Sequence, residues 1–326
     1  MNNFGNYLKV TIFGASHKEY VGVTIDGCLP GIKISPDDFT CDLQKRKAGR
    51  RGTTARIEDD VPQIVSGISD NITTGSTIKI LFKNKNIKSS DYNFVKDIPR
   101  PGHADFVAFK KYGIDYDYSG GGIFSGRMTV GLVAAGVIAK KICNEMLFNA
   151  ELISVNGSKN IQQEIDKAVD EGDSVGGIIE CRIKNVPVGL GMPFFDSVES
   201  LISHIVFAIP GIKGIEFGSG FKSAEMKGSQ HNDIIIDKEG TTATNNAGGI
   251  NGGITNGNDI AFRVAVKPSS SIAKPQKTYN FKTNKIEELS VKGRHDACFA
   301  LRVPPIVEAV AAIALANCMI ERDVKI

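Results

Sequence analysis

The stretch GGGIFSGRMTVGLVAAGVIAKKICNEMLF, residues 120–148, decides the fold. Its first three residues, Gly120, Gly121 and Gly122, fit poorly in a helix or a strand, because glycine loses the most backbone entropy on ordering. The segment that follows, residues 128–148, is rich in Ala, Val and Gly and predicts a helix that is buried on most sides. We therefore expect a central core helix behind a glycine loop whose backbone amides could bind an anionic ligand.

Segments of both regular kinds flank this helix. Apolar patterning and turn signals predict strands at residues 64–66, 77–82, 176–183 and 260–266, and short β-like runs between residues 7 and 25 that break at Gly14 and Gly22. Helical spacing and capping signals predict helices at residues 36–47, 161–171, 198–207 and 304–319. Because strands and helices mix without regular βαβ alternation, we expect an α+β fold. Because no linker-like segment appears, we expect one domain over residues 1–326.

Composition and charge are those of an ordinary globular chain. Of the 326 residues, 41% are hydrophobic and 23% charged, and the net charge of +3 gives no reason to expect nucleic acid or a membrane as a partner. The six cysteines form no CxxC pair, which favours reduced cytosolic thiols over a metal site. The first residues lack a secretory pattern, and the longest apolar stretch, residues 306–316, is short and contains Glu308. We therefore expect a cytoplasmic protein.

Three short segments combine glycine, histidine and arginine in a way that core packing does not require: residues 14–17 (GASH), 100–105 (RPGHAD) and 293–296 (GRHD). Arginines can hold anionic groups in bidentate geometry, and a histidine can donate a proton near neutrality. The candidate arginines are Arg46, Arg100, Arg127 and Arg294, and the candidate acids are His17 and His103. This set suits a substrate with several negative charges.

Other function classes find less support. The glycine loop at residues 120–122 matches neither a P-loop nor a complete GxGxxG fingerprint, which removes the main argument for a nucleoside triphosphatase or a nicotinamide-dependent dehydrogenase. The pair Arg50-Arg51 fits a solvated charge run and a nucleic-acid patch equally well, although no interleaved aromatic residues support base stacking. The glycines of residues 248–253 fit a tight hairpin as well as a ligand-binding loop.

Five blocks of the sequence resemble, in order, signature blocks of the chorismate synthase family. They are residues 14–17, 100–105, 247–253 (AGGINGG), 267–272 (KPSSSI) and 293–296, and the resemblance runs from Phe4 to about Asn317. It implies a layer of helices sandwiched between two antiparallel β-sheets, in a homotetramer. It also implies a lyase of the shikimate pathway that makes chorismate by anti elimination of phosphate from 5-enolpyruvylshikimate 3-phosphate. The cofactor would be reduced FMN, with no net redox change.

The resemblance also implies roles for individual residues. His103 would protonate the reduced flavin, His17 would protonate the departing phosphate, and Asp296 would help to move the flavin proton. The substrate would be held by Arg46, Arg100, Arg127 and Arg294, with either Arg50 or Arg51 as a further loop arginine. FMN would be contacted by Ile123, Phe124, Ser125, Pro210, Gly211, Gly252, Lys267, Pro268, Ser269, Ser270, Ser271 and Arg294, and no metal is implied.

Several positions differ from the commonest family pattern. Ala15 stands where most members have Glu, Lys18 where they have Gly, and Ile123-Phe124 where many have Arg-Ser. The first two differences could shift the proton affinity of His17. Two alternatives stay open: a flavin-dependent oxidoreductase on the same scaffold, and a scaffold that has lost its catalytic activity. Whether NADPH reduces the flavin stays open as well.

Overall fold

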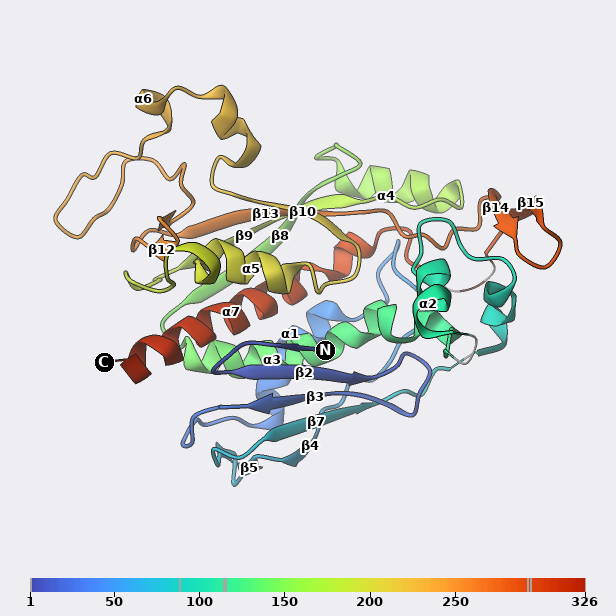
Figure 1. Cartoon of the computed structure of the whole chain (residues 1–326), viewed down its shortest axis with the longest axis horizontal. Coiled ribbons are helices and arrows are strands. Elements are labelled where there is room, and N and C mark those ends of the chain that lie inside the picture. Colours follow the sequence, from blue (N-terminus) through green and yellow to red (C-terminus); the bar gives the residue numbers. More distant parts are fainter. Residues whose placement is uncertain (1, 88, 114–115, 292, 294, 326) are drawn as a thin grey trace.

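The computed structural model of the chain describes residues 2–87, 89–113, 116–291, 293 and 295–325, and it places helices between two antiparallel sheets (Figure 1). The first sheet has the order β1-β2-β3-β7-β4 and comprises β1 (Asn3–Phe4), β2 (Lys9–Gly14), β3 (Tyr20–Asp26), β4 (Gln63–Ser66) and β7 (Ile78–Lys83). The second has the order β10-β13-β9-β8 and comprises β8 (Leu147–Val155), β9 (Gly177–Lys184), β10 (Ile212–Phe217) and β13 (Ile260–Val266). The expected α+β sandwich is confirmed.

Two long helices, α3 (Thr129–Ile142) and α7 (Pro304–Lys325), form the layer between the sheets (Figure 1). The first eleven residues of α3 are all buried, as its small apolar composition predicts. The two helices approach closely, because a Cβ atom on Gly136 would lie 2.2 Å from the Cβ atom of Ala309. By length and composition α7 could cross a membrane, but 83% of its apolar window is buried inside the protein. We therefore identify α7 as a core helix.

The core helix is shorter than the sequence predicts. It ends at Ile142 rather than at residue 148, and the chain enters β8 at Leu147. β8 pairs with β9 along its whole length, and this pairing uses the apolar residues that otherwise resemble a continuing helix. A short apolar segment fits helix and strand equally well, so the tertiary partner determines its structure.

Two further expectations need correction. Gly22 does not break a strand but lies inside β3, where a Cβ atom would lie 2.5 Å from Cζ of Phe13. The glycine therefore makes room for an aromatic ring on the neighbouring strand. The helix expected at residues 36–47 begins as a 3-10 turn, η1 (Pro36–Phe39), and continues as α1 (Thr40–Arg46).

The other expected elements are confirmed, with ends mostly within one residue. They include α4 (Ile161–Asp170), α5 (Val198–Val206) and the hairpin β11 (Ile250–Asn251) with β12 (Ile254–Thr255), while α7 extends six residues beyond the expected end. The remaining elements are β5 (Ile68–Ser69), β6 (Ile72–Thr73), α2 (Asp105–Tyr112), α6 (Gly228–His231), β14 (Gln276–Asn280), β15 (Lys285–Leu289) and the 3-10 segments η2 (Ser89–Lys96), η3 (Ser119–Phe124), η4 (Gly126–Met128), η5 (Phe194–Asp196), η6 (Gly220–Glu225) and η7 (Phe299–Arg302).

Candidate active site

A cavity of about 410 Å³ opens beside the N-terminal ends of α3 and α7, where loops from distant parts of the chain meet. Its lining consists of Arg46, Lys47, Ala48, Thr54, Arg56, Glu58, Asp60, Tyr92, Arg100, Gly102, His103, Ala104, Gly120, Phe124, Ser125, Gly126, Arg127, Pro210, Gly211, Lys267, Pro268, Ser269, Ser270, Ser271, His295, Asp296, Phe299 and Arg302. Among these side chains seven are Arg or Lys and three are Asp or Glu, so the described lining attracts anions.

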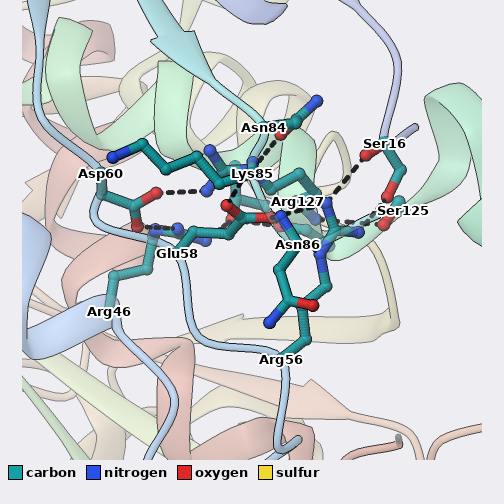
Figure 2. Close-up of polar contacts among 12 residues, drawn as sticks. Ser16, Arg46, Arg56, Glu58, Asp60, Asn84, Lys85, Asn86, Ser125 and Arg127 are labelled. Carbon is teal, nitrogen blue, oxygen red and sulfur yellow. Dashed lines mark hydrogen bonds and ion pairs between the residues drawn. The ribbon is translucent and has the colours of Figure 1, made fainter. Parts of the chain in front are cut away.

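Asp60 anchors two of the predicted arginines. Arg46 Nη2 lies 2.5 Å from Asp60 Oδ2, Arg127 Nη1 donates to Asp60 Oδ1, and all three side chains are at most 5% exposed (Figure 2). Burial opposes ionisation of Asp60, yet the two guanidinium groups hold the pKa of its carboxyl below the ordinary value. The buried Nε of Arg46 and Nη2 of Arg127 have no partner among the described atoms.

Asp105, the first residue of α2, organises the segment 100–105. Its Oδ2 accepts from Arg100 Nε at 2.7 Å and from the Arg100 backbone N–H at 3.0 Å, and its Oδ1 accepts from Arg100 Nη2 at 2.7 Å. The third nitrogen, Nη1, donates to Ser271 Oγ at 2.9 Å. Burial opposes ionisation, but Arg100 and His103 hold the pKa of Asp105 well below its ordinary range. The fork of Arg100 is therefore fixed at the wall of the cavity.

The same carboxylate fixes the tautomer of His103. Nδ1 of His103 lies 2.6 Å from Asp105 Oδ1 and 3.1 Å from Arg100 Nη2. Because Asp105 is ionised, we assign the proton to Nδ1, which donates to the carboxylate, and the arginine contact is then not a hydrogen bond to the ring. Burial lowers the pKa of His103 below 6.5, and Arg100 opposes its protonation too. The ring is therefore neutral near pH 7, with Nε2 unprotonated.

Two of the three glycines, Gly120 and Gly121, lie against the two candidate histidines. A Cβ atom on Gly120 would lie 2.4 Å from His17 Nε2, and one on Gly121 would lie 3.5 Å from His103 Nε2. All three glycines have positive φ, which other residues rarely adopt. The glycine run therefore gives the backbone its left-handed turns and leaves room for the rings, a more specific role than the amide donation expected from the sequence.

One wall of the cavity combines a lysine ammonium group and serine hydroxyls with an aromatic surface. Lys267 Nζ donates to Gly102 O at 2.9 Å and to Ser270 Oγ at 2.6 Å. Burial lowers the pKa of Lys267, which marks a partly desolvated ammonium group. Phe124 and Phe299 line the same cavity. A cation with hydroxyl groups beside aromatic surface could hold a ligand that carries both an anionic group and a flat ring.

Asp296 closes the side of the cavity next to α7. Its Oδ1 accepts from the backbone N–H of Thr54 at 2.9 Å, and its Oδ2 lies 3.3 Å from Nη1 of Arg302. This carboxylate thus ties the loop after α1 to the segment that leads into α7.

The structure brings most predicted site residues into this cavity. Those that line it are Arg46, Arg100, His103, Phe124, Ser125, Arg127, Pro210, Gly211, Lys267, Pro268, Ser269, Ser270, Ser271 and Asp296. His17 lies directly behind Gly120 and packs edge-on against the ring of Tyr92, with 5.4 Å between ring centroids. Ile123 lines a neighbouring apolar cavity of about 340 Å³, into which Phe124 also projects.

Other predicted residues lie elsewhere. Arg50 is exposed and donates to Lys45 O, and the exposed Arg51 pairs with Asp166 at 2.5 Å and with Asp170 at 3.0 Å on α4. Gly252 forms the turn between β11 and β12 and does not line the cavity. Arg294 lies outside the described residues.

Sequence reasoning missed several lining residues. Arg56, Glu58 and Asp60 alternate along the chain, and all three line the cavity. The signal was this two-residue spacing of charged residues, which places side chains on one side of an extended segment. Arg302 had no such signal, because its role depends on its pairing with Asp296. Within the described part of the chain, no group of three or more His, Cys, Asp or Glu side chains could hold a metal ion.

Comparison with known proteins gives a consistent result. The family model for chorismate synthase matches residues 8–320. The chorismate synthase of Chitinophaga pinensis is 57% identical over 321 residues, which cover 98% of this chain and 97% of that protein. The chorismate synthase of Pyrococcus abyssi is 43% identical over 348 residues and covers 98% of both. A crystal structure of a chorismate synthase, 24% identical, has a TM-score of 0.75 over 98% of this chain and 93% of that one, which supports the fold.

Proposed function

The chain belongs to the chorismate synthase family, which makes it a phosphate-eliminating carbon–oxygen lyase of aromatic amino acid biosynthesis, and we propose that the cavity described above is its active site. The observation that carries this proposal is a cavity lining with excess positive charge, in which Asp60 orients the side chains of Arg46 and Arg127. The substrate, 5-enolpyruvylshikimate 3-phosphate, carries a phosphate and two carboxylates. These anionic groups match the excess positive charge of the lining.

The arginines would bind substrate without a large rearrangement. Asp60 already orients Arg46 and Arg127, so little side-chain freedom is lost when the substrate binds. The guanidinium groups would also stabilise the charge that develops on the departing phosphate, because they act in a largely buried site. Arg100 would add positive charge at the wall that carries Ser271.

The two histidines would divide the proton transfers. We assign His17 to the departing phosphate, to whose oxygen it would donate a proton as the carbon–oxygen bond breaks. We assign His103 to the flavin, because its neutral ring has an unprotonated Nε2 that can accept and return a proton. Asp296, held by Thr54 and Arg302, would help to move the flavin proton.

The residues fit reduced FMN as the cofactor. Lys267 and the hydroxyl of Ser270 suit the phosphate of FMN, and Phe124 beside Pro210 suits its ring. When bound, the reduced flavin lends electron density transiently to the substrate, with no net redox change. The residues of this chain would bind and orient the two ligands and hold the protons at the histidines.

We further propose a homotetramer that acts in the cytoplasm on this small molecule, without nucleic acid or membrane partners. Large apolar side chains that are highly exposed on the single chain support assembly, because burial of such side chains at an interface is favourable. They are Phe194, Phe195, Phe221, Ile234, Ile235 and Ile236.

The decisive experiment is an anaerobic assay with 5-enolpyruvylshikimate 3-phosphate, in which FMN is reduced chemically and no nicotinamide is added. We expect equal amounts of phosphate and chorismate, with the flavin still reduced at the end. Consumption of reductant in proportion to product would instead identify an oxidoreductase. No product from folded, FMN-binding protein would identify a scaffold without catalytic activity, with Ala15 and Ile123 as the first positions to revert.

A further inference from the structure

Arg56 contacts the residue that precedes His17. Arg56 Nη1 donates to Ser16 Oγ at 2.8 Å, and Arg56 Nη2 donates to Ser16 O at 2.9 Å (Figure 2). Ser16 is fully buried, and its own N–H donates to Gly122 O at 3.2 Å. A fork that holds both the hydroxyl and the carbonyl fixes the peptide plane between Ser16 and His17.

Glu58 in turn holds Arg56. Glu58 Oε1 accepts from Arg56 Nε at 3.0 Å and from Arg56 Nη2 at 2.9 Å, while Glu58 Oε2 accepts from the backbone N–H of Lys85 at 2.9 Å. The Glu58 side chain is only 4% exposed. This places the guanidinium plane between two fixed partners, so Arg56 cannot turn toward the cavity without breaking buried contacts.

The pattern of contacts separates Arg56 from two of the arginines assigned to the substrate, Arg46 and Arg127, whereas Arg100 resembles Arg56 in having all three nitrogens paired. Each of the three nitrogens of Arg56 donates to a protein oxygen. Arg46 and Arg127 instead each keep one buried nitrogen without a partner among the described atoms. Arg56 is thus built into the wall, although it lines the same cavity.

The surroundings of His17 leave its ring little room. Gly120 touches the ring on one side, where even a methyl group would lie 2.4 Å from Nε2, and Tyr92 packs edge-on against it. A small rotation of the Ser16–His17 peptide would therefore move the imidazole out of this position. We propose that Arg56 is a positioning residue for His17, which acts through Ser16 to set the direction in which the imidazole delivers its proton.

This inference rests on the proposed function for the role of His17, but its test does not rest on activity alone. Arg56→Lys keeps the charge but loses the bidentate fork. We expect kcat to fall about 10- to 100-fold, as for a misplaced catalytic group, with KM changed less than about threefold. Arg182→Lys, an exposed arginine on β9 that pairs with Glu180, is the matched control and should retain wild-type kinetics.

The second readout is the titration of His17, followed by NMR of histidine-labelled protein with its signal assigned through a His17→Gln variant. We expect the His17 midpoint to shift in Arg56→Lys, while the other four histidines keep theirs. If Arg56→Lys does not fold, Glu58→Gln loosens the same fork and should produce a smaller shift of the same kind.

Two results would overturn the inference. A tenfold rise in KM at unchanged kcat would mean that Arg56 holds the substrate directly. An unchanged kcat together with an unchanged His17 titration would mean that it positions nothing. If the wild-type protein formed no chorismate, the proposed function would fail, while the titration would still decide whether Arg56 controls His17.

Discussion

Arg46 and Asp60 form an ion pair of 2.5 Å whose two side chains are at most 2% exposed, and the second oxygen of Asp60 binds Arg127 (Figure 2). Burial, together with the nearby Arg302 and Arg127, lowers the pKa of Arg46 to about 10, although Asp60 opposes this shift. The single negative charge of Asp60 thus offsets part of the positive charge of two guanidinium groups that are almost completely shielded from water. The positive charge that is left over matches a substrate with several anionic groups.

The first prediction concerns Asp60→Asn. The variant keeps the size of the side chain but leaves two buried guanidinium groups without a counter-charge, so we expect a loss of about 3 kcal/mol or more in the free energy of unfolding. Added inorganic phosphate should restore part of this loss, because an anion that binds only the folded site stabilises it. Denaturant unfolding with and without phosphate measures both effects.

Asp59→Asn is the matched control for this variant. Asp59 is the neighbouring residue and pairs with Lys85 at 2.5 Å, but both side chains are about 60% exposed. Water screens such a pair, so the unfolding midpoint should stay close to that of the wild type. Equal midpoints for the two variants would contradict the role of Asp60.

The second prediction concerns the thiols. Cys41 is exposed, whereas the other five cysteines are buried. Burial raises the pKa of Cys28 and Cys298 to about 11 and that of Cys143 and Cys318 to about 12, and it raises that of Cys181 further. A thiol reagent at pH 8 should therefore label one cysteine in the native protein and six after denaturation. Cys41→Ser should abolish the native labelling, and rapid labelling of that variant would show that the core is open.

The parts of the fold that local patterns describe could be predicted from sequence. Small apolar residues predicted α3, and alternating apolar residues predicted β13 to the residue. The end of α3 could not be predicted, because the apolar residues before and within β8 have no local mark that distinguishes strand from helix. Pairing with β9, more than twenty residues away, determines their conformation.

The same difference between local patterns and long-range contacts applies to the residues of the candidate site. His103 and Arg100 lie in one short segment with Asp105, so a motif could identify them. The contact that defines the place of Arg56 could not be predicted, because its partner Ser16 lies forty residues earlier in the chain. The choice between Arg50 and Arg51 depended on tertiary contacts in the same way, and both prove to lie on the surface, with Arg51 paired to α4.

The third prediction concerns cofactor binding. Lys267→Met keeps the length of the side chain but removes the ammonium group that we assign to the FMN phosphate. Charge-assisted hydrogen bonds contribute about 1.5–3 kcal/mol, so FMN affinity should fall about 10- to 100-fold. Quenching of flavin fluorescence measures the affinity without turnover. Lys184→Met, an exposed lysine at the end of β9, should bind FMN as the wild type does, and equal affinities for the two variants would remove Lys267 from the site.

The fourth prediction concerns catalysis by His103. His103→Ala should fold and bind FMN normally but turn over about a hundredfold or more slowly, as expected when a general acid or base is lost. His231→Ala, in the short helix α6, should keep full activity. The measurement is the anaerobic rate of chorismate formation with saturating FMN. Turnover near the wild-type rate would exclude His103 from the proton transfers.

The fifth prediction concerns stability against pH. Burial lowers the pKa of His103 below 6.5, so between 6.5 and that lower value the unfolded chain binds a proton that the folded protein does not. The free energy of unfolding should therefore fall as pH decreases below about 6.5. His103→Gln removes the titrating group, so its stability should fall less between pH 7.5 and pH 5.5 in denaturant unfolding.

Asp105 does not disturb the comparison of the wild type with His103→Gln, because both proteins retain it. Its pKa is lowered, so its contribution to the free energy of unfolding is lost only below about pH 3.8, outside the range compared. The other four histidines are also common to both proteins, so their contribution cancels in the difference to the extent that they do not contact residue 103. Parallel stability curves would mean that the folded protein protonates His103 as easily as the unfolded chain does. Burial would then contribute nothing to the neutral state of the ring, and the argument from burial for His103 as the group that accepts the flavin proton would fail.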